Sequence, residues 1–215
     1  MEISAGPPRQ PSKPLPDAPP PTPPTAASWI LVPTAVEMLP EPCKRCQSAA
    51  ADKGLPLDIK LFEQPLPTAR AAARALGVES GAITNSLVFS MKVTGGEPCH
   101  VLVLCPGDRR VDVRKLAKAV GCSKSRLKGA SADSVLAFTG YEPGGVAPFG
   151  HAVPPAHVLI DERVFLQPLV WCGAGVKPSI FSCTPAQLEA ASGGVRADLC
   201  TTEQPDDVLV LGDDD

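Results

Sequence analysis

The 215-residue sequence has no apolar run near the roughly eighteen residues that a membrane-spanning helix needs. It also lacks the motifs of several common enzyme classes: there is no Gly-x-Ser-x-Gly elbow, no P-loop, no dinucleotide fingerprint and no His-Glu-x-x-His. Aromatic residues make up only 4% of the chain, and there are three histidines. These absences predict a soluble protein with no membrane partner, and they exclude the catalytic sets that those motifs define.

A secretory signal is also missing from the sequence, because no basic stretch followed by an apolar one opens the chain. The eight cysteines are therefore not expected to form disulfides, which need an oxidising compartment. Cys43-Lys44-Arg45-Cys46 is the only C-x-x-C, and a structural zinc site would need a second pair. We expect no metal and no cofactor, with the cytoplasm as the default location and an organelle as the alternative.

Proline and charge divide the chain into three parts. Residues 1–42 hold thirteen of the twenty-six prolines, which favours a disordered or polyproline II segment. We predict a disordered extension over residues 1–40; a ligand for a proline-reading domain and a transit peptide are the alternatives. Residues 201–215 carry six acids and no base, and form a predicted acidic tail. Between them, residues 41–200 carry 18 basic and 14 acidic residues and are predicted to fold as one domain.

Residues 41–200 show helical and strand patterns that interleave irregularly. Apolar periodicity predicts helices from 41 or 43 to 53 and over 69–76, 113–120, 132–138 and 185–191. The last four follow the capping residues Thr68, Asp112, Ser131 and Thr184, and Thr184 forms a capping box with Gln187. Apolar, β-rich runs predict strands over 57–62, 86–91, 99–105, 158–161, 169–172, 179–183 and 195–199, and Thr94-Gly95-Gly96 predicts that 86–91 and 99–105 form a hairpin of buried strands. This order predicts an α+β domain with a mixed, curved sheet and flanking helices. A compact α/β domain of another lineage is the alternative.

The segment Thr139–His151 has an unusual composition, with four glycines, two prolines, an aromatic pair and a histidine. Glycine permits positive φ and close backbone approach, whereas proline fixes φ, so the loop is expected to be shaped and stiff. It is either a long surface turn or a concave nest of backbone N–H groups that binds an oxyanion, carboxylate or phosphate. His151 ends the loop and either reaches a ligand held there or is a bystander.

The segment from Arg109 to Lys128 is strongly basic, with eight basic residues and a single acid, Asp112. Arg114, Lys115 and Lys118 fall outside the apolar stripe of the predicted helix, so we expect them to point to solvent. The segment is either an ordinary solvated helix face or an electrostatic surface suited to a phosphate backbone.

Five segments, in chain order, resemble the YbaK family, also known as the bacterial prolyl-tRNA synthetase editing (INS) domain family. They are Asn85-Ser86-Leu87-Val88-Phe89, Pro106–Asp112, the glycine loop with Thr139-Gly140, Gly144-Gly145 and Pro148-Phe149-Gly150, Val158–Asp161, and Gly173-Ala174-Gly175. The resemblance covers roughly residues 41–200 and implies a single α+β domain of the YbaK/INS type.

The resemblance also implies an activity: hydrolysis of the ester that joins a wrong amino acid to the 3′ end of tRNA, usually proline tRNA. Oriented backbone donors and a fitted pocket can perform it without a metal or a dedicated nucleophile. The implied catalytic residues are Asn85, Gly144, Gly145 and His151. The implied substrate-binding residues are Ser86, Thr139, Gly140, Val146, Ala147, Pro148, Phe149, Gly150, Gly173, Ala174 and Gly175. The residues expected to contact the tRNA backbone are Arg109, Arg110, Arg114, Lys115 and Lys118.

Asn85 departs from the pattern of the family that the chain resembles, because many family members have a lysine there that is linked to activity and to holding the tRNA end. Members with Asn-Ser-Leu-Val-Phe, as in this chain, form a subgroup. Asparagine forms hydrogen bonds but offers no charge to a phosphate. Two functions therefore stay open. The first is a free-standing aminoacyl-tRNA deacylase acting in trans, with tRNA and an aminoacyl-tRNA synthetase as partners. The second is a non-catalytic module that binds tRNA or an aminoacyl nucleotide and has lost hydrolysis.

Overall fold

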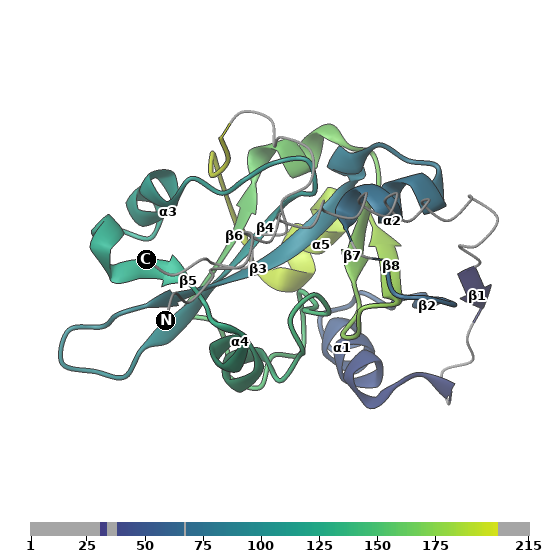
Figure 1. Cartoon of the computed structure of the whole chain (residues 1–215), viewed down its shortest axis with the longest axis horizontal. Coiled ribbons are helices and arrows are strands. Elements are labelled where there is room, and N and C mark those ends of the chain that lie inside the picture. Colours follow the sequence, from purple (N-terminus) through teal and green to yellow (C-terminus); the bar gives the residue numbers. More distant parts are fainter. Residues whose placement is uncertain (1–30, 34–37, 67, 202–215) are drawn as a thin grey trace, which may run out of the picture.

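The computed structural model describes residues 31–33, 38–66 and 68–201, drawn in colour in Figure 1. Most of the predicted proline-rich extension and the predicted acidic tail lie outside the described residues. The described residues form a mixed sheet with helices on both faces, which confirms the predicted fold class. None of the helices in this part of the chain is long and apolar enough to cross a membrane.

The sheet has nine strands in the order β1-β2-β8-β7-β3-β4-β6-β9, and β5 pairs with β3 beside this path. The long hairpin of β3 and β4 forms its centre, as the sequence predicts. Pairing is parallel between β3 and β7, β4 and β6, and β6 and β9, and antiparallel elsewhere. The strands are β1 (Leu31–Pro33), β2 (Lys60–Phe62), β3 (Ile83–Met91), β4 (Cys99–Pro106), β5 (Leu127–Gly129), β6 (His157–Asp161), β7 (Val170–Gly173), β8 (Ser179–Cys183) and β9 (Val195–Ala197).

Local capping signals start most of the helices. Thr68, Asp112 and Ser131 each accept a hydrogen bond from a first-turn amide, and Thr184 and Gln187 form a reciprocal capping box. These are the capping residues that the sequence predicts. The helices are α1 (Glu41–Ala51), α2 (Ala69–Leu76), α3 (Val113–Ala119), α4 (Ala132–Thr139) and α5 (Pro185–Ser192), with short 3-10 turns η3 (Ser80–Ala82), η4 (Lys124–Arg126) and η5 (Glu162–Leu166).

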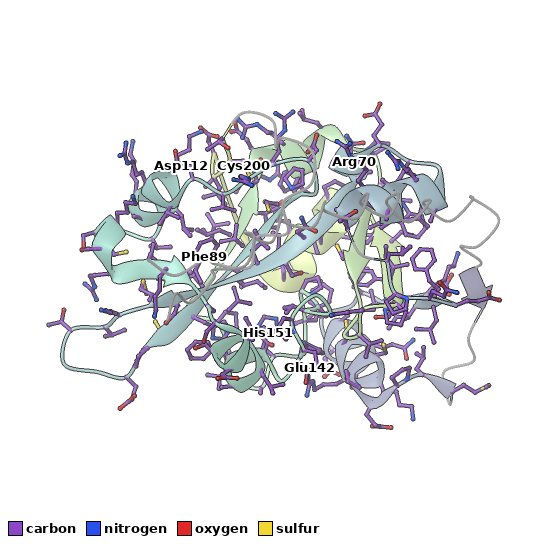
Figure 2. The ribbon with its side chains drawn as sticks, in the orientation of Figure 1. Arg70, Phe89, Asp112, Glu142, His151 and Cys200 are labelled. Atoms are coloured by element: carbon purple, nitrogen blue, oxygen red, sulfur yellow. The ribbon has the colours of Figure 1, made fainter. Side chains whose placement is uncertain are left out.

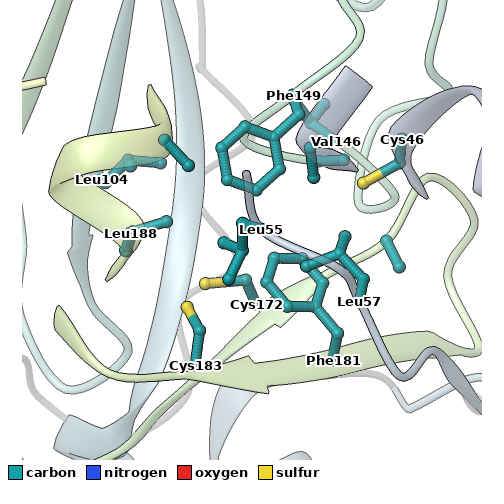
Figure 3. Packing of buried hydrophobic residues seen from close by; sticks show 14 of the residues in the cluster. Cys46, Leu55, Leu57, Leu104, Val146, Phe149, Cys172, Phe181, Cys183 and Leu188 are labelled. Atoms are coloured by element: carbon teal, nitrogen blue, oxygen red, sulfur yellow. The ribbon is translucent and has the colours of Figure 1, made fainter. Parts of the chain in front are cut away.

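Strand β4 separates two cores, because its successive side chains point to opposite faces of the sheet. Leu102 and Leu104 pack with α1, α4 and α5 on one face, whereas Val101 and Val103 pack with α3 on the other. Figure 1 shows α1 and α4 below the sheet and α2 and α3 above it. Figure 3 shows part of the lower core, where residues from the two termini of the domain meet around Phe149.

Two features lie within the segment predicted as a disordered extension. Leu31–Pro33 forms the edge strand β1, paired with β2, and Leu39 is buried. Proline is tolerated there because an edge strand leaves one row of N–H groups unpaired. The prolines dominate the composition of residues 1–40, but residues 25–32 contain none, and β1 begins within that interval. The predicted strand 57–62 is also shorter, since only Lys60–Phe62 pairs with a neighbour.

Candidate functional site

The glycine-rich loop Thr139–His151 leaves the end of α4 and lies below β3, between α4 and α1. Figure 2 shows Glu142 and His151 on this side of the sheet, with Asp112 and Cys200 on the other side. The loop packs against α1 and against the segment Gly173–Lys177 that follows β7.

The glycines of the loop are required by its own close packing. A Cβ on Gly145 would lie 2.9 Å from the Cα of Val176, a distance that real Cβ atoms do not show. Gly150 has a φ of +71°, and a Cβ there would lie 2.8 Å from the hydroxyl of Tyr141. Gly175 has a φ of +115°, and its Cβ would meet the carbonyl oxygen of Pro42 at 2.7 Å. The loop, α1 and the 173–177 segment are therefore pressed backbone to backbone, as a stiff loop requires.

Tyr141, the only tyrosine in the chain, ties the loop to itself. Its side chain is fully buried, and its hydroxyl donates to the carbonyl of Phe149 at 2.7 Å. Burial raises the pKa of Tyr141 to about 12, so the hydroxyl keeps the proton that it donates. At the other end, the Thr139 hydroxyl donates to Val135 and accepts from the amide of Tyr141. These bonds fix the loop's two ends relative to one another.

Arg45 joins α1 to the start of the loop. Its Nη2 donates to the carbonyl of Gly140 at 2.8 Å and to that of Thr139 at 3.3 Å. The guanidinium carbon also lies 4.3 Å from the centre of the Tyr141 ring, in cation–π geometry. Arg45 therefore fixes the start of the loop to α1, while the buried Tyr141 links two parts of the loop to each other.

Two histidines connect the end of the loop to the central strand β4. His100 is fully buried on β4, and its Nε2 lies 3.2 Å from Nδ1 of His151. The Nε2 of His151 lies 2.8 Å from the carbonyl oxygen of Ala147. A carbonyl only accepts, so Nε2 of His151 carries a proton, its Nδ1 accepts, and Nε2 of His100 donates. The chain of bonds thus assigns both tautomers and anchors Ala147.

Both imidazoles of this pair are held in the neutral form. Burial, with a smaller contribution from the nearby His151, lowers the pKa of His100 to about 4. Burial also lowers the pKa of His151, against the opposing effect of the Ala147 carbonyl. His100 stacks on Phe138 of α4, with ring centres 4.9 Å apart. His151 uses both ring nitrogens in this arrangement, so its contacts are those of a positioning residue.

The middle of the loop contains amide groups without acceptors. Val146 is 9% exposed and Ala147 is fully buried, yet among the described residues neither backbone N–H donates to an acceptor. Buried main-chain donors are almost always paired in folded proteins. Two unpaired amides in a fixed loop are therefore candidates for binding a ligand, in the manner of an oxyanion-binding nest.

The edge of β3 that faces β7 contains a short interruption. Strand β7 pairs with Ile83 and Thr84, and β5 pairs with Phe89–Met91 on the same side. Neither pairing includes Asn85, Ser86 or Leu87, so the two neighbours leave a gap beside these residues. Open sheets commonly bind ligands where adjacent strands separate.

Asn85 and Ser86 point to opposite faces at this gap. Ser86 lies opposite Leu104 in the β3–β4 register, on the face of the glycine loop, whereas Asn85 lies opposite Cys105, on the face of α3. The Ser86 hydroxyl oxygen is buried without a hydrogen-bond partner. The Asn85 main chain therefore borders the gap, but its side chain does not share the loop's face.

The remaining residues predicted for the substrate lie close together. A Cβ on Gly173 would lie 3.3 Å from the carbonyl oxygen of Val146, so the loop and the Gly173–Gly175 segment touch. Val146, Ala147 and Phe149 pack into the same core as Ala174. The side chain of Lys177 also covers Gly144, since its Cε would be 3.1 Å from a Cβ there.

The residues expected to contact the tRNA backbone lie on the other face of the sheet, in and around α3 (Figure 1). The expectation for Lys115 needs correction: it does not point freely to solvent. Its ammonium group binds Asp198 at 2.8 Å and the carbonyl of Cys200 at 2.8 Å. The apolar stripe of α3 gave no sign of this partner 83 residues away, whereas Arg114 and Lys118 are exposed as predicted.

Several site residues were missed by sequence reasoning. In the sequence, Arg45 appears only as a residue between the two cysteines of the C-x-x-C segment, and His100 only as a residue of the predicted strand 99–105. Neither carries a local signal, because their partners lie 95 and 51 residues away. Tyr141 could have been found, since it is the only tyrosine and lies inside the glycine loop.

Two cavities in the described residues lie away from the loop. The larger, about 470 Å³, is lined by α1 and residues 56–57, and the smaller, about 60 Å³, lies at the end of β4. Within the described ranges no three His, Cys, Asp or Glu side chains converge as metal ligands. Cys43 and Cys46 are fully buried core residues of α1, and burial raises the pKa of both thiols.

The geometry defines a class of protein: a mixed α/β domain whose site is a rigid loop of backbone donors beside an interrupted sheet edge. The sequence profile described as "Aminoacyl-tRNA editing domain" matches residues 63–191. The chain belongs to this family, which confirms the resemblance seen in its five segments.

Three individual proteins are similar to this chain. YwhH of Bacillus subtilis, an uncharacterized protein, is 32% identical over 144 residues, covering 66% of this chain and 87% of YwhH. EbsC of Enterococcus faecalis, a candidate Cys-tRNA(Pro)/Cys-tRNA(Cys) deacylase, is 29% identical over 136 residues, covering 63% and 79%. A solved structure described as a candidate trans-editing enzyme for prolyl-tRNA synthetase superposes with a TM-score of 0.65 at 34% identity, covering 76% of this chain and 99% of its own.

Proposed function

We propose that this protein hydrolyses the ester bond of mischarged aminoacyl-tRNA in trans, and that proline tRNA is its substrate. Membership of the aminoacyl-tRNA editing family supports the reaction class. The names of EbsC and of the solved trans-editing structure, which refer to proline tRNA and prolyl-tRNA synthetase, support the choice of tRNA and a synthetase as a functional partner.

The observation that carries the proposal is the pair of unpaired amides at Val146 and Ala147. Ester hydrolysis develops negative charge on the carbonyl oxygen, and preorganised donors in a dry site stabilise it most. The bonds from Arg45, Tyr141 and His151 hold the loop, so its amides need no rearrangement when the charge forms. Each well-placed oxyanion donor contributes roughly 10²–10³ in rate.

The proposed roles follow from the contacts. Gly144 and Gly145 let the loop approach the Gly173–Gly175 segment, and the loop amides bind the ester carbonyl. Water attacks that carbonyl with help from the substrate's own free ribose hydroxyl. This hydroxyl is next to the ester oxygen that leaves with the tRNA. His151 positions Ala147, because both of its ring nitrogens are already engaged. Asn85 lies at the border of the site, where its main chain pairs with β4. On the other face, Arg109, Arg110, Arg114 and Lys118 provide charge for the tRNA backbone.

A panel of tRNAs charged with wrong amino acids tests the proposal directly. Each is incubated with the full chain, and release of the amino acid is compared with a buffer control. We expect release from at least one mischarged proline tRNA and slower release from the correctly charged one. Binding without release from any tRNA would instead identify the non-catalytic module. That alternative is open because this chain has Asn85 where many family members have a lysine.

A further inference from the structure

The gap beside β3 offers the main chain of a single residue. In this strand the even-numbered residues turn their N–H and C=O groups toward β5: the carbonyl of Val88 accepts from Ala130 at 3.0 Å, and the amide of Lys92 donates to Arg126 at 2.9 Å. Main-chain groups alternate sides along a strand. Of the three residues at the gap, only Ser86 therefore directs both of its main-chain groups into it.

Ser86 has three polar groups without partners in the described residues. Neither its N–H nor its C=O meets β7 or β5, and its hydroxyl oxygen is buried without a hydrogen bond. Ser90 is a useful contrast, because it occupies the same face and edge of β3 but is paired with His100 on one side and Lys128 on the other. Ser86 is half-buried on a central strand, where unpaired polar groups are costly, so their presence at one residue points to a missing partner.

The gap is also next to the proposed oxyanion site. Register places Thr84 beside Cys172, so Gly173 lies at the entrance of the gap. The carbonyl of Val146 lies within 3.3 Å of the Cβ position of Gly173. A group held by Ser86 would therefore lie between the sheet edge and the loop whose amides are unpaired.

We propose that the aminoacyl group of the substrate fills this gap as a strand one residue long. Its α-ammonium group donates to the Ser86 carbonyl, and its ester carbonyl oxygen accepts from the Ser86 amide. An aminoacyl ester has the donor, α-carbon and carbonyl of one strand residue, and a directly opposed residue in an antiparallel pair exchanges both bonds in this way. The proposal rests on the proposed function and names the part of the substrate that the sheet recognises.

This binding mode has two consequences for the reaction. The ester carbonyl oxygen receives one donor from Ser86 and another from the loop, which gives the two-sided oxyanion contact that acyl-transfer sites use. Recognition also depends on the α-amino group, which every amino acid shares, and not on the amino-acid side chain. The site therefore separates aminoacyl esters as a class from simple acyl esters.

Paired substrates that differ only in the α-amino group test the proposal with the full chain. Alanyl-tRNA is compared with propionyl-tRNA, and prolyl-tRNA with the cyclopentanecarbonyl ester. We expect kcat/KM to fall roughly tenfold or more when the amine is removed, because a hydrogen bond from a charged group to the Ser86 carbonyl is lost. The loss should persist in Ser86→Ala, which keeps the main chain, and in the control Ser90→Ala. Equal rates for the paired substrates, or disappearance of the loss in Ser86→Ala, would overturn the main-chain contact.

A binding measurement separates this inference from the proposed hydrolysis. The probes are 3′-alanylamino-3′-deoxyadenosine, which cannot be hydrolysed as an ester, and its propionyl counterpart. We expect the alanyl probe to slow hydrogen exchange of the Ser86 amide and the propionyl probe to do so much less. If no tRNA is deacylated but this difference is seen, hydrolysis is absent and the one-residue strand stands. Equal exchange with and without the alanyl probe would refute the strand.

Discussion

The glycine loop and the basic segment Arg109–Lys128 both stand out in the sequence by their composition. In the structure, their polar groups differ in which hydrogen bonds and ion pairs they form. In the loop, side chains are paired so that main-chain amides at Val146 and Ala147 are left over. In the basic segment, part of the charge is bound internally: Lys115 pairs with Asp198, and the Nε of Arg126 donates to the carbonyl of Lys92. The rest of the charge is mostly exposed to solvent, as at Arg114 and Lys118, although Arg110 has a buried Nε that lacks a partner. Unpaired groups in a rigid setting indicate a site more reliably than net charge does.

The paired charges near α3 secure the C-terminal end of the domain. Asp161 is fully buried and accepts from the amides of Leu199 and Cys200 at 2.9 and 3.0 Å. Asp198 then bridges Arg163 and Lys115. A buried carboxylate with several donors is strongly coupled to its partners, and removing one of them leaves an uncompensated charge. The network is therefore a structural clamp, and only its exposed neighbours are available to nucleic acid.

Replacing Gly145 by alanine should give the largest loss of deacylation rate. A small loss would contradict the view that the packed loop, and not the basic segment, forms the site. The new Cβ would lie 2.9 Å from the Cα of Val176, and backbone atoms cannot move aside as a side chain can. The loop must shift, and a displacement near 1 Å costs on the order of 10²-fold in rate. We expect deacylation of mischarged tRNA to fall by about that factor. Gly129→Ala is the matched control, since a Cβ there meets nothing within 4 Å. Comparable losses in both variants would mean that the loop's fit is not what matters.

Arg45→Met should have the next largest effect. It removes the donors to the carbonyls of Thr139 and Gly140 and the contact with the Tyr141 ring. Arg45 is exposed, and solvent weakens hydrogen bonds from exposed charged groups, so thermal unfolding should show a loss of about 1 kcal/mol and deacylation should slow about fivefold. Lys44→Met is the control, because Lys44 makes an exposed i,i+3 pair with Glu41. We expect it to change stability by less than about 0.5 kcal/mol. If Lys44→Met lost as much stability as Arg45→Met, the contacts of Arg45 with the loop would have no specific effect.

The histidine pair predicts that the loop's anchor weakens in acid. His100 has a pKa near 4 in the fold, below its ordinary value near 6.5, so the unfolded chain binds its proton first. Stability is therefore complete above pH 6.5 and falls as the pH drops from 6.5 toward 4. Linkage gives a loss of about 2 kcal/mol from this group by pH 5.

His100→Gln isolates this effect, because glutamine still offers a donor to His151 but does not titrate. The free energy of unfolding is measured by urea denaturation between pH 7 and 5. It should fall less steeply with decreasing pH in the variant, and the difference should equal the contribution of the His100 titration. Carboxylates titrate equally in both proteins and cancel in the difference. Parallel curves for the two proteins would show that His100 does not couple the loop to pH.

The sequence predicts what depends on neighbouring residues. The caps at Thr68, Asp112 and Thr184 and the β3–β4 hairpin were predicted because a few adjacent residues decide them. The orientation of Asn85 and Ser86 was not predicted, since polar residues occur on both faces of β3. Thr84, Ser86 and Ser90 lie on the face of the loop, and Asn85 interrupts the apolar residues of the other face, so no alternation marks which face Asn85 shares. Arg45, His100 and the partner of Lys115 were missed for another reason: their contacts join residues 51 to 95 positions apart, which no local pattern records.

The smallest effect is expected from the exposed part of the basic segment, and it decides whether that segment contacts tRNA at all. Arg114 and Lys118 are exposed on α3, whereas Lys115 is bound to Asp198. Arg114→Ala with Lys118→Ala should cost little stability, because exposed side chains without special contacts usually contribute less than about 0.5 kcal/mol.

If these two residues neutralise two phosphates, the double variant should bind tRNA a few-fold more weakly. The slope of log K against log salt should then become shallower by roughly one to two, since each neutralised phosphate releases condensed counterions. Lys115→Met is the matched comparison on the same helix. It should lower thermal stability, because Asp198 loses a partner, and leave the salt slope nearly unchanged.

The opposite result, with the slope set by Lys115 and not by its exposed neighbours, would require the ion pair between Lys115 and Asp198 to open when tRNA binds. Equal slopes in all three proteins would place the tRNA body against the loop's side of the sheet, where Lys177 already lies over Gly144.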